Sequence, residues 1–188
     1  MPAPALLPWT GDEEADRLIA SDPNALLIGF VLDQQVTVQK AFAGPWTLRQ
    51  RLGHLDPRLI ATMDADAFLA VCREKPAVHR FPSTMAARVQ DVCQVIVDEY
   101  DGDASRIWTT ATTGDDLAAR LGALPGIGPL KVTSLMVLLA RQYGVDLPGL
   151  EAHLPTHPTL GEVRTADELA AYQAGKRAAK AAKRAAAQ

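Results

Sequence analysis

Apolar residues recur at helical spacing along most of the chain, and nowhere do they alternate with polar residues as in a half-buried strand. Residues 25–32 are apolar on every side and predict a helix that is buried all round. Residues 85–100 have one apolar and one polar face, which is typical of a helix at the edge of a core. The apolar positions of that face are Met85, Val89, Val92, Cys93, Ile96, Val97 and Tyr100.

The same pattern predicts further helices, and capping residues mark where several of them begin. Asp12 or Thr10 is expected to cap a first helix that contains Ile19, and Ser83 the helix of residues 85–100. Gly122 is expected to end a helix. The remaining helices are expected over residues 104–110, 115–121, 129–143 and 165–188, with short helices over residues 45–73, separated at Gly53-His54 and Asp56-Pro57, the last capped by Asp64.

Two segments rich in proline separate these helices, residues 75–82 and residues 144–162, and both are expected to be loops. The abundance of Ala and Leu also favours helices. The chain therefore predicts an all-α fold. We expect residues 1–160 to form one domain and residues 161–188 to form an Ala/Lys-rich C-terminal helix or tail.

The charge of the chain limits what it binds. The net charge of −3 over 188 residues speaks against a general nucleic-acid binder. Basic residues without acidic neighbours gather at the C-terminus, either as a phosphate-binding arm or as an ordinary solvated helix. A chain of this kind is expected to bind DNA only through a local patch or backbone amides, with modest, salt-sensitive affinity. The basic residues are Lys176, Arg177, Lys180, Lys183 and Arg184.

Cysteines, histidines and hydropathy exclude several classes of protein. Cys72 and Cys93 are expected to be reduced core residues of a cytoplasmic protein, and two cysteines are too few to hold an iron–sulfur cluster. The four histidines show no metal-binding spacing, so no cofactor is expected. The longest apolar run, residues 25–32, is too short to span a membrane. We expect a monomer that does not bind membranes.

The strongest motif is Leu124-Pro-Gly-Ile-Gly128, which lies between two apolar helical segments. Gly126 and Gly128 permit a tight turn with positive φ, and Pro129 suits the first turn of a helix. Ile127 is expected to point inward. The N–H groups from Gly126 to Leu130 would then point outward at the positive end of a helix dipole, where a phosphate oxygen binds, with the charge of Lys131 nearby. The alternative is a plain helix–turn–helix corner that binds nothing.

This segment closely resembles the hairpin of the helix-hairpin-helix base-excision DNA glycosylases, a superfamily that includes endonuclease III and the adenine and alkylpurine glycosylases. Together with two weaker matches, the resemblance spans roughly residues 25–145. It implies a two-lobed helical fold with the active cleft between the lobes, an iron–sulfur-free member, and a partner that is double-stranded DNA with a damaged or abasic site.

The weaker matches fall on two segments that the resemblance assigns to wedging the duplex. In Val31-Leu-Asp-Gln-Gln-Val-Thr-Val38, Gln35, with Gln34 beside it, matches a glutamine that occupies the space left by the flipped base. Arg80-Phe81 and Met85-Ala-Ala-Arg-Val89 resemble the loop and helix start of a second wedge. Without the family, Asp33-Gln34-Gln35 has a simpler interpretation as a helix end in which Asp33 caps the next helix.

Glycosylases stabilise positive charge on the sugar with a carboxylate. The resemblance places it just beyond the second hairpin helix, where Asp146 is the first candidate; Asp33 ranks second and Glu151 third. The family's Val-Asp-Thr-His context is absent there, and only Val145-Asp146 is similar. Asp146 also has a simple interpretation as a solvated loop residue.

The Lys nucleophile of family members that also cut the backbone corresponds to Leu130. Lys131 is displaced by one residue, about 100° around a helix. The resemblance therefore implies a monofunctional glycosylase. Two other classes stay open: a non-catalytic helix-hairpin-helix module that binds abasic or distorted DNA, and a helical protein-interaction scaffold whose hairpin binds no DNA.

Overall fold

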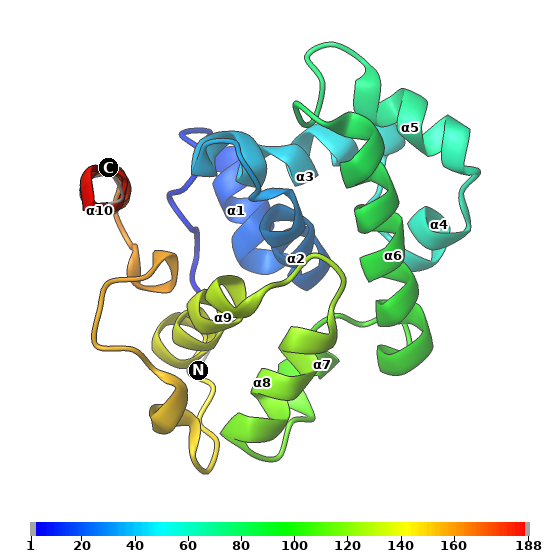
Figure 1. Cartoon of the computed structure of the whole chain (residues 1–188). Coiled ribbons are helices and arrows are strands. Elements are labelled where there is room, and N and C mark those ends of the chain that lie inside the picture. Colours follow the sequence, from blue (N-terminus) through cyan, green and yellow to red (C-terminus); the bar gives the residue numbers. More distant parts are fainter. Residues whose placement is uncertain (1–2, 187–188) are drawn as a thin grey trace.

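The computed structural model describes residues 3–186, and helices are its only regular elements in this range, which confirms the all-α prediction (Figure 1). Ten are α-helices and two are short 3₁₀ helices. Their bounds are α1 Glu13–Ser21, α2 Pro23–Leu32, α3 Val38–Leu52, α4 Pro57–Thr62, α5 Ala65–Arg73, α6 Pro82–Tyr100, α7 Arg106–Thr109, α8 Gly114–Ala123, α9 Pro129–Gln142, η1 Leu150–His153, η2 Leu160–Glu162 and α10 Ala166–Ala186.

Helix α2 lies at the centre of the fold. Its residues from Asn24 to Leu32 are all buried, as the uniformly apolar sequence predicted. It packs against α1, α3 and α6. The rings of Phe30 and Phe42 meet edge to face at 5.1 Å, and Trp9 meets Phe42 at 4.8 Å. This aromatic cluster joins the N-terminal segment to α2 and α3.

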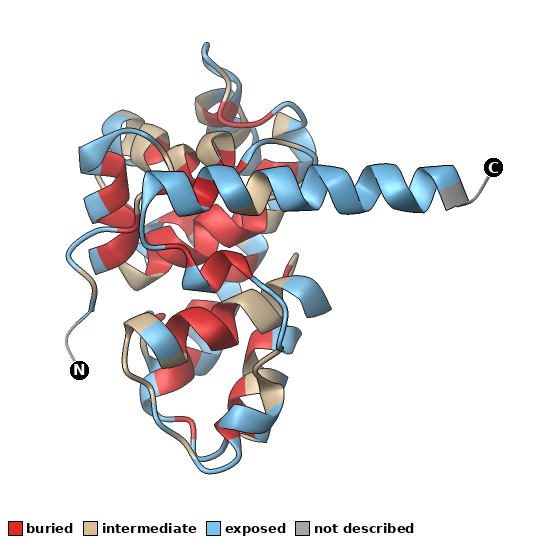
Figure 2. Cartoon of the chain, turned by 90° about the vertical axis from the view of Figure 1, so that its left-hand side faces the viewer, coloured by how far each residue is buried: buried red, intermediate tan, exposed pale blue. Residues whose placement is uncertain are grey.

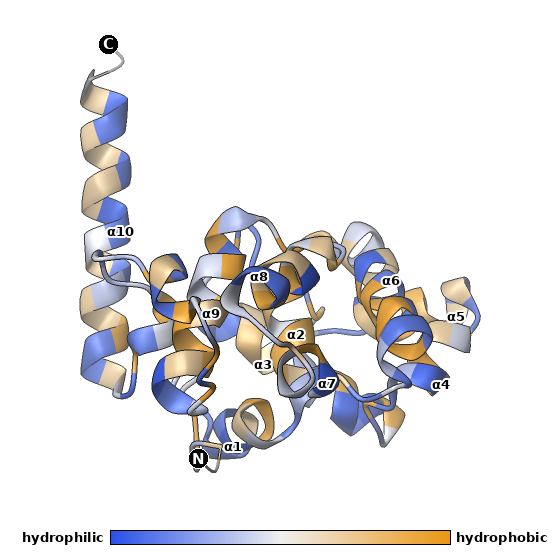
Figure 3. Cartoon of the chain, turned by 90° about the horizontal axis from the view of Figure 1, so that it is seen from below, coloured by the Kyte–Doolittle hydropathy of each residue, from blue (hydrophilic) through white to orange (hydrophobic). Residues whose placement is uncertain are grey.

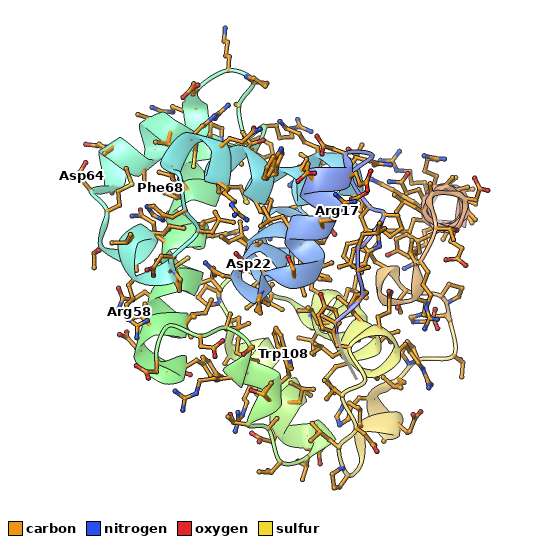
Figure 4. The ribbon with its side chains drawn as sticks, turned by 180° about the vertical axis from the view of Figure 1, so that it is seen from behind. Arg17, Asp22, Arg58, Asp64, Phe68 and Trp108 are labelled. Atoms are coloured by element: carbon orange, nitrogen blue, oxygen red, sulfur yellow. The ribbon has the colours of Figure 1, made fainter. Side chains whose placement is uncertain are left out.

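Two further groups of elements surround this centre. Helices α4 and α5 pack on α6, and α8 packs on α9, with η2 against α9 (Figure 1). Buried residues line the inward faces of these helices (Figure 2). In the view from behind, Phe68 of α5 lies toward α6, while Asp22 and Asp64 mark the starts of α2 and α5 (Figure 4).

Most predicted helix starts are confirmed, but two caps are wrong. Asp12 and Asp64 cap α1 and α5 with their carboxylates. Thr37 caps α3, so Asp33 does not. The N–H of Asp33 instead closes the end of α2. Helix α6 begins at Pro82, and the hydroxyl of Ser83 accepts a hydrogen bond from Arg73 at 2.8 Å.

Two helices continue through residues that were expected to bound them. Pro45 lies inside α3, seven residues after its start, and is buried with Phe42. The apolar contacts of this face outweigh the one hydrogen bond that a proline removes. Gly122 lies inside α8, which ends at Ala123, and the cap residue is Leu124. Since Gly122 has no positive φ, it does not act as a C-terminal cap.

Helix α10 is attached to the body through its first half only. Leu169 is 4% exposed, and Tyr172 and Gln173 are half-buried. The side-chain amides of Gln173 and Gln39 donate to each other at 2.8 and 3.4 Å, which holds α10 against the start of α3. From Ala174 to Ala185 every residue is exposed. Figures 2 and 3 show this half extending beyond the other helices.

Within residues 3–186, the helices are all too short or too polar to cross a lipid bilayer.

Two glycines inside helices provide an opposed pair of stability predictions. A methyl group at Gly29 would collide with the ring of Phe42, which is packed on all sides, whereas one at Gly175 would meet nothing within 4 Å. We expect Gly29→Ala to lower the free energy of unfolding by about 1–3 kcal/mol, because the core cannot expand freely. We expect Gly175→Ala either to raise the free energy of unfolding slightly, by about 0.5–1 kcal/mol at most, or to increase the helicity of α10.

Urea unfolding followed by circular dichroism measures both variants. Equal effects of the two substitutions would contradict the packing of α2 against α3.

Candidate nucleic-acid interface

The hairpin between α8 and α9 has the backbone geometry that its glycines require, with one difference. Gly126 has φ +80°, as expected, but Gly128 has φ −86° and ψ 174°, which any residue adopts. Gly128 is instead the N-cap of α9, and a methyl group there would meet nothing within 4 Å. The expectation of positive φ at Gly128 is therefore wrong, and its small size leaves the approach to the helix end open.

Some backbone N–H groups of the hairpin donate hydrogen bonds to acceptors within residues 3–186, and others do not. The N–H of Ile127 donates to Leu124 O at 3.1 Å, and the side chain of Ile127 is 5% exposed, so this residue points inward as predicted. Among residues 3–186, no acceptor lies within hydrogen-bond distance of the N–H groups of Gly126, Gly128 or Leu130. These three donors stand at or just before the start of α9, where the helix dipole favours an anion.

Lys131 turns into the protein and not outward toward a ligand. Its ammonium donates to Gly126 O at 3.0 Å and lies 3.5 Å from Val31 O. Burial lowers the pKa of Lys131 to about 8; the Asp33 carboxylate acts in the opposite direction, and Arg88 adds to the lowering. Lys131 thus fastens the hairpin to the end of α2. Leu130, one position earlier, is 82% exposed.

The loop between α2 and α3 is held in an unusual conformation beside the hairpin. Gln35 has φ +54°, in the left-handed region that few non-glycine residues adopt, and it is exposed. Gln34 is fixed by two contacts: its side-chain oxygen accepts from Arg88 of α6, and its carbonyl oxygen lies 2.9 Å from His79 Nε2. The backbone strain at Gln35 is therefore maintained by contacts of its neighbour.

His79 joins this loop to the segment before α6. Its Nδ1 accepts the N–H of Phe81 at 3.0 Å, so in the neutral ring Nε2 carries the proton and donates to Gln34 O. His79 is 1% exposed, although it lies in the proline-rich segment that was expected to be a loop. Arg80 lies over the ring of Phe81, 4.7 Å from its centroid, and reaches Gln35 O at 3.5 Å.

The structure therefore brings together the three segments that the sequence singled out separately. Arg88 connects two of them, because it donates to Gln34 while its Cδ lies 3.7 Å from the position of a Cβ at Gly126. The hairpin loop crosses the end of α2 (Figure 1). Exposed residues on this face include Gly128 and Leu130 of the hairpin, Gln35, and Phe81, which is 41% exposed.

Asp33 is the carboxylate that lies among these segments. Burial raises its pKa, and the charges of Lys176 and Lys131 oppose this shift. Two ammonium groups from helices distant in sequence thus act on one half-buried carboxylate at the C-terminal end of α2.

Asp146 and Glu151 lie elsewhere. Asp146 is exposed and follows α9, whose 14 residues put about 21 Å between its ends. It lines a surface cavity of about 460 Å³ with Trp108 and Tyr143, on a side of the molecule visible from behind (Figure 4). Glu151 is exposed and pairs with Arg141 at 3.3 Å. The structure does not bring either carboxylate to the hairpin.

The sequence pattern did not predict the contacts that three residues make on this face. Arg88 and His79 are identified only by the contacts they make with Gln34, 54 and 45 residues away. Lys176 was singled out as part of the basic tail but not as a neighbour of Asp33. No local pattern encodes such long-range contacts.

Neither the cysteines nor any cluster of metal-binding side chains forms a second site within residues 3–186. Cys72 and Cys93 are both buried and unpaired, and burial raises their thiol pKa values to about 11 and about 12. In the described part of the chain, no three His, Cys, Asp or Glu side chains gather as they would around a metal ion.

Comparison with protein-family models, with curated proteins and with solved structures gives no match to this chain. What the site does must therefore be argued from its own geometry.

Protonation of His79 is expected to weaken the fold in mild acid. Burial lowers the pKa of His79 below its usual 6.5, and the positive charges of Lys40 and Arg80 add to this. The unfolded chain thus takes up the proton first, so this contribution is complete above about pH 6.5 and declines as pH falls, by at most about 1.4 kcal/mol per pH unit.

The free energy of unfolding of the wild type and of His79→Gln, measured from pH 7.5 to 5, tests this. The pH slope should be smaller in His79→Gln, and it should be unchanged in His157→Gln, a matched change at an exposed histidine. Parallel curves for all three proteins would refute a buried neutral His79.

Proposed function

We propose that the chain binds double-stranded DNA at a damaged base and hydrolyses the N-glycosidic bond of that base, as a monofunctional DNA glycosylase with a two-lobed helix-hairpin-helix fold. The observation that supports this best is the gathering of the hairpin, Gln34-Gln35 and Arg80-Phe81 on one face. The proposal includes a monomer that acts in the cytoplasm on DNA.

The hairpin provides the phosphate contact of this proposal. Three backbone N–H groups, those of Gly126, Gly128 and Leu130, make no hydrogen bond to an acceptor within residues 3–186, and they surround one helix start. A phosphate oxygen would satisfy them without regard to base sequence, which positions the protein on a duplex.

The two neighbouring loops provide the wedge. A base that leaves the stack must be replaced, and Gln35 offers a side-chain amide that both donates and accepts, while Phe81 offers an exposed ring that inserts between base steps. His79 fixes the spacing between these loops, because it binds both at once.

Asp33 is the carboxylate that this geometry favours over Asp146. The charge of Lys131, which is fastened to the hairpin, acts on Asp33, whereas Asp146 lies beyond the far end of α9. An ionised Asp33 would stabilise the positive charge that develops on the sugar as the base departs. Leu130, at the position of a Schiff-base lysine, cannot form such an adduct.

One observation favours a second function, a non-catalytic module that binds abasic or distorted DNA. Three surface cavities, of about 460–500 Å³, are lined by neither Asp33 nor the hairpin. A protein without a pocket beside its carboxylate would bind a distorted duplex and release it unchanged.

Incubation with duplexes that contain uracil, hypoxanthine, alkylpurines or oxidised bases, followed by alkali, tests catalysis. We expect strand cleavage after alkali on one class of duplex. Asp33→Asn should lower the single-turnover rate by about 10²-fold or more, because it removes the charge and keeps the shape. Asp146→Asn is the matched control and should cleave at the wild-type rate.

The outcomes separate the two functions. Tight binding of an abasic-site analogue without cleavage of any duplex would favour the non-catalytic module. Loss of activity in Asp146→Asn alone would overturn the assignment of Asp33.

Substitution of Gly128 separates binding from folding. Its backbone angles are those of an N-cap, so Gly128→Asp should leave stability unchanged or higher, while its carboxylate occupies the amides and repels phosphate. We expect the affinity for duplex DNA to fall more than tenfold at about 50 mM salt. Gly128→Asn caps the helix without a charge and should lose less.

Fluorescence anisotropy with a labelled duplex measures the affinities, and thermal unfolding verifies the fold. Wild-type affinity in Gly128→Asp would show that the hairpin amides do not contact DNA.

A further inference from the structure

The basic residues of α10 form one stripe along the helix. They occupy positions 176, 177, 180, 183 and 184, and at 100° per residue all five lie within an arc of about 120°. The opposite arc consists of small side chains, Ala178, Ala181, Ala182 and Ala185, and no acidic residue follows Glu168. A helix that was only a solvated tail would have no reason to segregate its charges in this way.

The stripe continues the face by which α10 is attached to the body. Leu169, Tyr172 and Gln173, which pack on the body, lie in register with Lys176 at spacings of seven, four and three residues. The attached face and the charged face are therefore one face. Where α10 extends beyond the body, hydrophilic residues follow one side of the helix (Figure 3).

The first residue of the stripe reaches the hairpin face. Gln173 is bonded to Gln39 near the start of α3, and the charge of Lys176 acts on Asp33, which also interacts with Lys131. From this junction α10 extends on the side where the hairpin loop crosses α2 (Figures 1 and 3). The stripe thus runs outward from the edge of the candidate interface.

Two of the cations at the hairpin face are bonded within the protein, whereas Arg80, which lies over the ring of Phe81, is exposed. The ammonium of Lys131 is bonded to Gly126 O, and Arg88 is bonded to the side chain of Gln34. Neutral amides position a phosphate but supply little of the electrostatic attraction that holds proteins on DNA. The exposed stripe adds further positive charges at the edge of the interface.

Repulsion between the like charges of the stripe destabilises α10, and a bound polyanion would relieve this repulsion. Like charges three and four residues apart, as in Lys176, Lys180 and Arg184, repel each other along the helix, and no acidic side chain of α10 lies among them. Regularly spaced negative charges along the stripe would relieve this repulsion.

We infer that α10 is a phosphate-binding arm whose basic stripe lies along the backbone of duplex DNA that is seated on the hairpin face. This inference rests on the proposed function for the position of the duplex, but it does not depend on catalysis. The occupant is a duplex because the stripe is regular, extends about 12 Å from Lys176 to Arg184, and adjoins a face that already offers phosphate-binding amides.

Two variants of the full chain test the arm. In the neutralised variant, Arg177→Gln, Lys180→Gln, Lys183→Gln and Arg184→Gln remove four charges. The face-swapped variant exchanges the same four basic residues with neighbouring alanines and keeps composition and net charge constant. Its substitutions are Arg177→Ala with Ala178→Arg, Lys180→Ala with Ala181→Lys, Lys183→Ala with Ala182→Lys, and Arg184→Ala with Ala185→Arg.

Affinity for an undamaged 25-base-pair duplex is measured between 50 and 200 mM salt. We expect both variants to bind about tenfold or more weakly at 50 mM, and the slope of log K against log salt to fall by about two to four, near 0.9 per lost phosphate contact. Circular dichroism of each variant verifies that α10 remains helical.

Other results overturn the arm, and they are distinguishable from failure of the proposed function. Wild-type affinity and slope in both variants would exclude the arm, even if lesion cleavage is observed. If the neutralised variant binds weakly but the face-swapped variant does not, net charge alone accounts for the binding, and the arrangement of the charges in a stripe has no role. Stripe-dependent binding of phosphatidylserine vesicles without any binding of duplex would replace DNA by a membrane surface.

Discussion

The arrangement of the candidate interface depends on the fastening of the hairpin to the end of α2 by the Lys131 ammonium. This group donates to Gly126 O and approaches Val31 O, which joins two backbone segments 95 residues apart in the sequence. Because α2 is buried along nearly its whole length, it cannot shift without disrupting the core. The hairpin amides, the strained Gln35 and the half-buried Asp33 therefore keep fixed positions relative to each other. A site for a rigid, repetitive ligand such as a duplex benefits from this rigidity, since little freedom is lost on binding.

The electrostatics of the chain are consistent with a division of labour. The hairpin offers uncharged donors that position one phosphate, while α10 carries five positive charges without acidic neighbours, beyond the acidic body. Burial further suppresses charge at the face, because it lowers the pKa of Lys131 and raises that of Asp33. A protein with a net charge of −3 can associate with DNA in this way without binding it through its whole surface. Such binding is sensitive to salt, because it rests on a small number of phosphate contacts.

The loops of this face show how a buried polar residue positions exposed ones. His79 is neutral, almost fully buried, and bonded on one side to Gln34 O and on the other to the N–H of Phe81. Gln34 is followed directly by the exposed Gln35, and Phe81 itself carries an exposed side chain. A buried ring that satisfies both nitrogens rigidifies its surroundings, whereas an unsatisfied one would destabilise them. The distance between the two loops is thereby fixed by a residue that touches no solvent.

The sequence by itself determined the local features of this protein. Uniform apolarity specified the buried α2, Asp12 and Asp64 specified two helix starts, and Leu124-Pro-Gly-Ile-Gly128 specified a turn with Gly126 at positive φ and Ile127 inward, because each depends on residues a few positions apart. Only the tertiary structure decided which of these features meet. It placed Asp33, and not Asp146, near the hairpin, turned Lys131 inward, carried α3 through Pro45, and joined Gln34 to His79 and Arg88. These outcomes rest on contacts between segments far apart in the chain, and their free energies exceed the local preferences that a sequence pattern records.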